Sequence, residues 1–145
     1  MDKKRILLVD DDKSVLKTLT EILQFEGYDV DTTETGKEAI EKSKTQFYNV
    51  ALLDIKLPDI DGTELLQIID GHIPKTAKIV ITGYPSTENA IKALNLEADA
   101  YITKPVEPKQ LLETIRKKLE NQDKADKITE ENVTKWLQTR ADKIQ

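Results

Sequence analysis

The sequence predicts an α/β fold in which a five-stranded parallel sheet is covered by helices on both faces. Short apolar runs alternate along the chain with longer segments whose apolar residues recur every three or four positions, as in strands and helices. The breaks between them are short, and five such strand-helix units occupy about 120 residues, which is typical of a doubly wound parallel sheet. The run 50–53 is apolar at every position, as expected of a strand that helices cover on both sides.

Each strand is expected from its own pattern. The first, third and fourth are uninterrupted apolar runs and fit the interior of the sheet. In the second, Tyr28, Val30 and Thr32 alternate with polar residues, which fits an edge strand exposed on one side. The fifth is short and is stopped by Lys104 and Pro105. In chain order the strands are expected at 6–9, 28–32, 50–53, 79–81 and 100–102.

The helices are delimited by capping and helix-breaking residues. Gly27 is expected to end the first helix, and the proline at the start of the fifth is favoured in a first turn. Short polar side chains before the other helices can accept hydrogen bonds from the first free amides. In order, the helices are expected to start at Asp11 or Asp12, at Thr35 or Gly36, at Gly62, at Ser86 and near Pro108.

Length and composition narrow the functional classes. The chain has 145 residues, 27 acidic and 22 basic, for a net charge of −5, which disfavours nonspecific binding to nucleic acid or anionic membranes. It contains no cysteine, so disulfides and thiolate metal sites are excluded. The apolar run near the N-terminus is too short for a signal peptide or a membrane span. The expectation is a single cytoplasmic domain with a short extension.

Polar side chains that could bind a ligand or take part in a reaction lie where the expected strands end. Because the carboxyl ends of parallel strands meet at one edge of a sheet, these side chains are expected at one mouth, where ligands bind in open α/β folds. Pro105 favours an extended conformation for Lys104, the residue before it. This conformation carries the side-chain amine of Lys104 out over that edge. The strand-end residues are Asp10, Asp11, Asp54, Thr82 and Lys104.

Three carboxylates at one mouth repel one another unless a cation is present. Oxygen ligands without histidine or cysteine favour a hard ion, and few protein ligands favour Mg²⁺ over Ca²⁺. Mg²⁺ with an amine and a hydroxyl around one aspartate indicates a phosphoryl site, with Asp54 as the nucleophile. The simpler interpretation, that each acid only caps a helix, is disfavoured by the coincidence of four strand ends. Asp59 and Asp61 are expected outside this site, in a loop and at a helix cap.

Four segments resemble the receiver domain of two-component response regulators. They are ILLVDDD, LLDIKLPDIDG, VITGY and AYITKP, each at an expected strand end, and the resemblance covers residues 4–120. It implies a flavodoxin-like sheet with strand order 2-1-3-4-5. It also implies a protein that is not a turnover enzyme but catalyses its own phosphotransfer and autodephosphorylation.

The resemblance assigns roles to the residues at the mouth. Asp54 would be the phosphoacceptor, Asp10 and Asp11 would hold Mg²⁺ with Asp11 as the direct ligand, and the carbonyl of Lys56 would also bind the metal. Lys56 together with Tyr84 would tune the lifetime of the aspartyl phosphate.

The remaining roles that the resemblance implies concern the response to phosphorylation. Thr82 would hydrogen-bond the phosphoryl group, Lys104 would pair with it, and the peptide between Lys104 and Pro105 would be cis. Tyr101 matches the aromatic switch position. The donor would be a sensor histidine kinase or a phosphotransfer protein, and the surface of the fourth helix, fifth strand and fifth helix would be recognised by a downstream protein or a second copy.

The last part of the chain is expected to be separate from the receiver domain. With a receiver at 1–121, residues 122–145 would form a helical extension or the remnant of a linker. After a polar stretch at 121–127, Val133, Trp136 and Leu137 indicate an amphipathic helix, with Thr129 as a possible cap. This helix is expected to pack on the receiver or on another chain.

Two other functional classes remain open. A phosphohydrolase of the haloacid dehalogenase type uses an Asp-x-Asp pair after its first strand, and Asp10 and Asp12 have that spacing. Against it, no cap domain fits, and the positions of Asp54, Thr82 and Lys104 would be unexplained. The second alternative is an interaction module that works without phosphorylation, which the complete set of site residues disfavours.

Overall fold

Five parallel strands form one sheet in the order β2-β1-β3-β4-β5, so the predicted fold is confirmed. The computed structural model describes residues 3–69, 75–83, 86–95 and 98–144. The pairing register aligns Val9 of β1 with Leu53 of β3, and Leu53 with Val80 of β4. The strands therefore end close together at one edge of the sheet. Their bounds are β1 Arg5–Val9, β2 Asp29–Thr33, β3 Val50–Leu53, β4 Ala77–Thr82 and β5 Ala100–Thr103.

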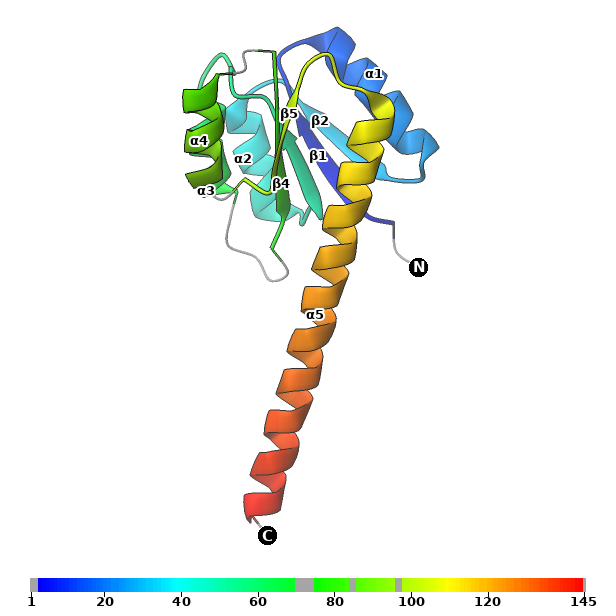
Figure 1. Cartoon of the computed structure of the whole chain (residues 1–145), viewed down its shortest axis with the longest axis vertical. Helices are drawn as coiled ribbons and strands as arrows, with labels where there is room; N and C mark the ends of the chain where they lie inside the picture. Colours follow the sequence, from blue (N-terminus) through cyan, green and yellow to red (C-terminus); the bar gives the residue numbers. More distant parts are fainter. Residues whose placement is uncertain (1–2, 70–74, 84–85, 96–97, 145) are drawn as a thin grey trace.

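The helices form two layers, one on each face of the sheet (Figure 1). Their bounds are α1 Lys13–Phe25, α2 Gly36–Thr45, α3 Gly62–Ile68, α4 Thr87–Asn95 and α5 Pro108–Ile144. Because side chains alternate along a strand, Leu52 packs in the core under α1 and α5, whereas Leu53 packs in the core under α2, α3 and α4. Both side chains are fully buried, which explains why β3 is apolar throughout.

Local capping explains where the first two helices begin. Asp12 precedes α1, and its side chain accepts hydrogen bonds from the amides of Ser14 (2.9 Å) and Val15 (3.3 Å). Thr35 does the same for α2 through its hydroxyl oxygen. After α1 the chain turns at Gly27, whose φ of 96° is accessible at low cost only to glycine.

The predicted break before a separate C-terminal helix is wrong, because α5 runs continuously from Pro108 to Ile144. The stretch 121–127 is polar but contains neither glycine nor proline, so nothing in it interrupts helical hydrogen bonding. The possible cap Thr129 therefore lies inside the helix. Val133, Trp136 and Leu137 are 52%, 57% and 55% exposed, so the predicted packing of this segment on its own receiver is also wrong.

Gln122 is the last buried residue described on α5. It bonds the helix to the edge of the sheet at which β3 and β4 begin. Its amide donates to the carbonyl oxygens of Asn49 (3.0 Å) and Lys75 (2.7 Å), and its side-chain oxygen accepts from the Asn49 side chain (3.0 Å). The predicted boundary at 121/122 is thus not marked by a break in structure. No helix among the described residues is long and apolar enough to cross a membrane.

Replacing Gln122 with alanine is expected to lower the free energy of unfolding by about 2 kcal/mol, because the buried side-chain amide group loses its three hydrogen bonds to Asn49 and Lys75. Urea denaturation followed by circular dichroism measures the loss. The matched control is Asn121→Ala, since Asn121 is the exposed preceding residue of the same helix. Equal stability of the two variants would contradict the role of Gln122 as an anchor.

Candidate functional site

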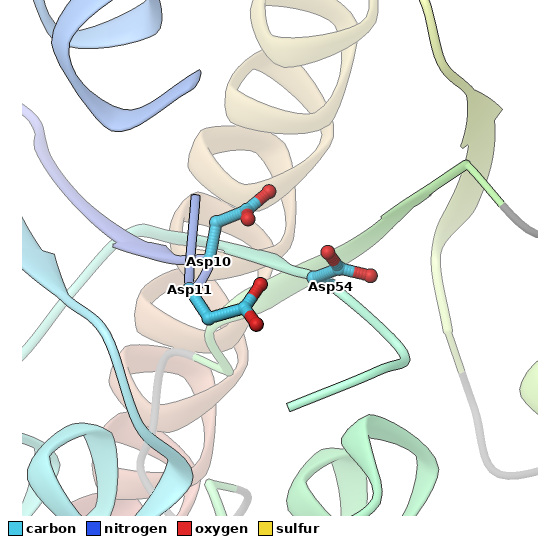
Figure 2. Close-up of side chains that lie close together, drawn as sticks. All are labelled: Asp10, Asp11 and Asp54. Carbon is cyan, nitrogen blue, oxygen red and sulfur yellow. The ribbon is translucent and has the colours of Figure 1, made fainter. Parts of the chain in front are cut away.

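The edge at which the strands end carries a cluster of three carboxylates. Asp10 and Asp11 follow β1 and Asp54 follows β3, and one oxygen of each lies within 4.8 Å of the others. Figure 2 shows the three side chains extending from two neighbouring strand ends into the same region. Lys104, which follows β5, places its Nζ 2.7 Å from Asp10 Oδ2 and 3.1 Å from Asp54 Oδ2. The structure therefore brings these four predicted residues together.

The backbone positions both buried acids through hydrogen bonds that continue the sheet. The amide of Asp10 donates to the carbonyl of Thr33 (3.1 Å), and the amide of Asp54 donates to the carbonyl of Val9 (3.0 Å). Each acid also accepts one local amide, because the Asp12 amide donates to Asp10 (2.9 Å) and the Lys56 amide donates to Asp54 (3.2 Å). These bonds orient the carboxylates toward the mouth before any ligand is present.

Burial and charge dominate the electrostatics of the cluster. Asp10 and Asp54 are 3% and 5% exposed, whereas Asp11 is exposed. The pKa of Asp54 is raised, chiefly by burial and further by the charge of Asp10, and the hydrogen bond from Lys104 offsets only part of this. Burial by itself would lower the pKa of Lys104, but its bonds to Asp10 and Asp54 outweigh burial and raise it. The single ammonium group of Lys104 thus neutralises only part of the negative charge of the three carboxylates.

Asp54→Asn is expected to stabilise the metal-free protein at neutral pH by about 1 kcal/mol, because it removes a buried charge that has one cationic partner. Since the folded-state pKa of Asp54 is raised, the wild type loses stability relative to the variant as the pH rises from the unfolded value, near 3.9, through the folded value. Thermal melts of both proteins with a chelator, from acid to neutral pH, measure the difference. A difference that does not grow with pH would contradict this account.

The donor set fits a hard divalent cation. It consists of carboxylate oxygens, with no sulfur or imidazole group in the cluster, and its charge exceeds what Lys104 balances. Asp12 lies outside the cluster, because its carboxylate caps α1 and accepts from Ser14. The pair of Asp10 and Asp12 that a dehalogenase-type site needs is therefore not formed at this mouth.

The other predicted site residues surround the cluster. Thr82 ends β4, is fully buried, and its carbonyl accepts a hydrogen bond from the Lys104 amide (2.8 Å). The peptide between Lys104 and Pro105 is cis. Tyr101 on β5 is partly buried, and its hydroxyl is inaccessible and has no hydrogen-bond partner in the described part of the chain. Lys56 is exposed beside Asp54. Tyr84 lies outside the described residues.

The loop after Asp54 is held by hydrogen bonds of Asp59 and Asp61 whose partners the sequence did not predict. Asp59 was expected to serve as a loop or capping acid, and it caps α2 rather than the helix that follows it. Its carboxylate accepts the amides of Gly36 (2.8 Å) and Lys37 (2.9 Å), and these bonds lower its pKa. Asp61 immediately precedes α3, and its carbonyl accepts a hydrogen bond from the amide of Glu64 (3.0 Å).

Gly62 is a site residue that the sequence analysis missed as such. A Cβ at this position would collide with the backbone carbonyl oxygen of Asp54 and come 2.7 Å from Ile55 Cα. The amide of Gly62 donates to the carbonyl of Ile55 (2.8 Å), so the loop folds back directly onto the backbone of the acceptor strand. The only signal in the sequence was a glycine at the start of a helix, where a side-chain cap is usual.

Comparison with known proteins gives a consistent result. The sequence model of the response regulator receiver domain matches residues 6–116. The cell cycle response regulator CtrA of Brucella ovis is 33% identical over 111 residues, which are 77% of this chain and 48% of CtrA. The chain thus spans about half the length of the curated relatives that it matches.

Solved structures agree with this match. A CheY-like response regulator receiver domain protein from Methanospirillum hungatei JF-1 has a TM-score of 0.82 at 50% identity, covering 86% of this chain and 99% of that one. A response regulator protein from Burkholderia pseudomallei, whose structure contains a phosphorylated aspartic acid, a calcium ion and citrate, has a TM-score of 0.75 at 25% identity, covering 88% and 75%. With the family match across most of its length, this chain belongs to the response regulator receiver domains of two-component systems.

Proposed function

We propose that Asp54 accepts a phosphoryl group from the phosphohistidine of a sensor histidine kinase or phosphotransfer protein. The observation that carries this proposal is the buried Asp54 carboxylate at a strand end, with two further carboxylates and the Lys104 amine around it. The phosphorylated aspartic acid in the Burkholderia pseudomallei protein supports it. Receiver domains are not enzymes that turn over external substrates, so the chain would catalyse only its own phosphorylation and dephosphorylation.

A Mg²⁺ ion would be held by Asp10, Asp11 and Asp54 together with the carbonyl oxygen of Lys56. Asp11 would bind the ion directly, because its carboxylate is exposed at the edge of the sheet where the strands end. The bound ion would neutralise charge on the phosphoryl oxygens. The undercompensated charge of the cluster supports this assignment, because a divalent cation would balance the carboxylates that one lysine does not.

In the transfer itself, a carboxylate oxygen of Asp54 forms a bond to phosphorus as the bond from phosphorus to the donor imidazole nitrogen breaks. The electron pair of the broken bond stays on the imidazole, which leaves as the neutral base once it carries a proton. The Lys104 ammonium, already 3.1 Å from Asp54, pairs with a phosphoryl oxygen. The Thr82 hydroxyl donates a hydrogen bond to another.

An open pocket beside the site suits the approach of a donor protein. It has a volume of about 420 Å³ and lies between α1 and the segment that follows β5. Apolar side chains and hydroxyls line it, next to the amine that faces Asp54. The lining residues are Ser14, Val15, Thr18, Leu19, Lys104, Pro105 and Val106.

Phosphorylation would change the surface formed by α4, β5 and α5, which a downstream protein or a second copy recognises. When Thr82 moves toward the phosphoryl group, Tyr101 fills the space it leaves. Exposed Ile91 on α4 gives this surface an apolar contact point. Lys56 beside Asp54, together with Tyr84, would tune how quickly water reaches the aspartyl phosphate.

Mass spectrometry after incubation with Mg²⁺ and acetyl phosphate tests the proposal. The intact protein is expected to gain the mass of one phosphoryl group, mapped to Asp54 after borohydride reduction and digestion. Asp54→Asn is expected to take up none, and a chelator is expected to abolish uptake by the wild type. Equal labelling of Asp54→Asn, or labelling that does not need a divalent ion, would overturn the proposal.

Tyr101→Phe tests the state of the switch residue. Because the Tyr101 hydroxyl is buried without a partner in the described residues, its removal is expected to leave stability unchanged or to raise it by about 1 kcal/mol. The ring remains, so uptake of phosphate is expected to persist. Chemical denaturation and the labelling assay check both points, and a clear loss of stability would show that the hydroxyl makes a favourable contact.

A further inference from the structure

The side of α5 that covers the sheet carries a stripe of apolar residues, which is interrupted where the sheet ends and resumes beyond it on the same side of the helix. The members of its first part recur every four positions and are buried against the domain: they are Leu111, Ile115 and Leu119. The polar Gln122 that follows them is buried as well. Continuing in the same steps from Gln122 leads through Asp126 to Val133, Trp136 and Leu137. The second half of the helix therefore presents its apolar side chains in the direction in which the domain lies in the first half.

No part of the described domain covers this second stretch. Figure 1 shows the lower half of α5 extending well beyond the sheet. Val133, Trp136 and Leu137, at positions i, i+3 and i+4 of one helix face, are each more than half exposed. Three neighbouring large apolar side chains on an isolated helix indicate a contact surface for another molecule.

The charge of the projecting segment has opposite signs in its two halves. Residues 121–131 contain four acids and two lysines, for a net charge of −2, whereas residues 132–145 contain three basic residues and one acid, for a net charge of +2. A second copy of the segment running in the opposite direction would place each acidic half beside a basic half. A parallel copy would place like charges together.

We propose that the projecting half of α5 binds the same segment of a second copy of this chain in an antiparallel pair. The bulk of the domain requires this direction. Leu111 and Ile115 are buried by the domain, so the domain occupies the side of α5 on which the stripe lies. If two copies paired in parallel and in register through the stripe, both domains would occupy the same space between the helices. Antiparallel pairing places the domains at opposite ends.

The apolar residues set the register of the pair. A two-fold axis between residues 134 and 135 places Val133 opposite Trp136 of the partner subunit, so each valine packs on an indole ring. Leu137 flanks this contact on both helices. Gln122, held by Asn49 and Lys75, fixes the direction in which each helix leaves its domain. The pair would join two receivers end to end, independently of phosphorylation of Asp54.

Sedimentation of the full chain from low micromolar to near-millimolar concentration tests the association. The wild type is expected to convert from monomer to dimer, and emission from Trp136, the only tryptophan, is expected to shift to shorter wavelength as it becomes buried. Leu137→Glu is expected to remain monomeric. Its matched control, Gln138→Glu, adds the same charge to the next exposed residue on another face and is expected to dimerise. Helical circular dichroism verifies that both variants retain α5. A wild type that stays monomeric, or two variants that behave alike, would overturn the proposal.

Disulfide trapping tests the direction of the pair, since the chain has no cysteine of its own. In the antiparallel pair two copies of residue 133 lie close together, but two copies of residue 126, which is on the same side of the helix, are separated by about 26 Å along the helices. Val133→Cys is therefore expected to form a cross-linked dimer on mild oxidation, and Asp126→Cys is not, because the Cα atoms must approach within about 7 Å. Efficient cross-linking of Asp126→Cys, which a parallel pair in register would bring together, would reject the antiparallel pair. Asp54→Asn should associate like the wild type, so failure here leaves the phosphoryl proposal untouched.

Discussion

Lys104→Met is expected to lower the free energy of unfolding by about 3 kcal/mol at neutral pH. This value is the lower end of the range for a buried ion pair that loses one partner, and it is chosen because the Lys104 side chain is still 21% exposed. The substitution leaves Asp10 and Asp54, both almost fully buried, without the ammonium that bonds to each of them. Phosphate uptake should fall severely as well, since no cation replaces the amine at the phosphoryl oxygens. Chemical denaturation and labelling with acetyl phosphate measure the two losses.

The pH dependence of this loss follows from the charges involved. The pKa of Lys104 is raised in the folded state, so its contribution is complete below the unfolded lysine value, near 10.4, and is lost as the pH rises through the folded value. At acid pH the carboxylates become protonated, the repulsion in the variant disappears, and the difference from wild type should shrink. A constant difference across the acid range would contradict the ion-pair explanation.

Two further variants separate the ion pair from a general effect of losing a lysine. Lys109→Met removes an exposed lysine at the start of α5 and is expected to change stability little. Adding Asp54→Asn to Lys104→Met removes one of the two repelling carboxylates, so the double variant should recover part of the lost stability. Strict additivity of the two substitutions would show that Lys104 and Asp54 do not interact.

Gly62→Ala is the second substitution with a large expected effect. Its Cβ would collide with the carbonyl oxygen of Asp54, and because that atom belongs to the backbone it cannot rotate away as a side chain would. The loop or the strand end must shift, with a stability loss at the upper end of the range of about 1–3 kcal/mol seen for overpacking. Since the displaced backbone carries Asp54, phosphate uptake is expected to fall along with stability.

The matched control for this prediction is Gly83→Ala. Beyond the two chain neighbours of Gly83, the described atom nearest to a Cβ at this position would be in the flexible side chain of Lys104, at 3.7 Å, so the variant should fold and accept phosphate like the wild type. Thermal melts and intact-mass labelling of both alanine variants make the comparison. If Gly62→Ala matched Gly83→Ala in both measurements, the close approach of the loop to Asp54 would have no functional importance.

Local patterns in the sequence were sufficient to predict the elements that carry the site. Apolar runs and caps predicted strands ending at Asp10, Asp54 and Thr82, and parallel strands necessarily bring such ends to one edge. Asp12 was correctly expected as a possible cap of α1. The wrong prediction of a break at 121–127 also has a local origin, because the stretch is polar but all its residues are compatible with a helix.

The contacts that join distant segments were beyond the reach of sequence patterns. Lys104 bonds both Asp10 and Asp54, Asp59 caps α2 rather than α3, and Gln122 bonds the backbone of Asn49. Each depends on the positions of two segments far apart in the chain, and spacing along one segment contains no information about the other. The sequence by itself determined which side chains stand at the strand ends, because strand boundaries follow from local apolarity. Only the tertiary structure decided their partners and their charge balance, because distances between segments exist only once the sheet and its helices are packed.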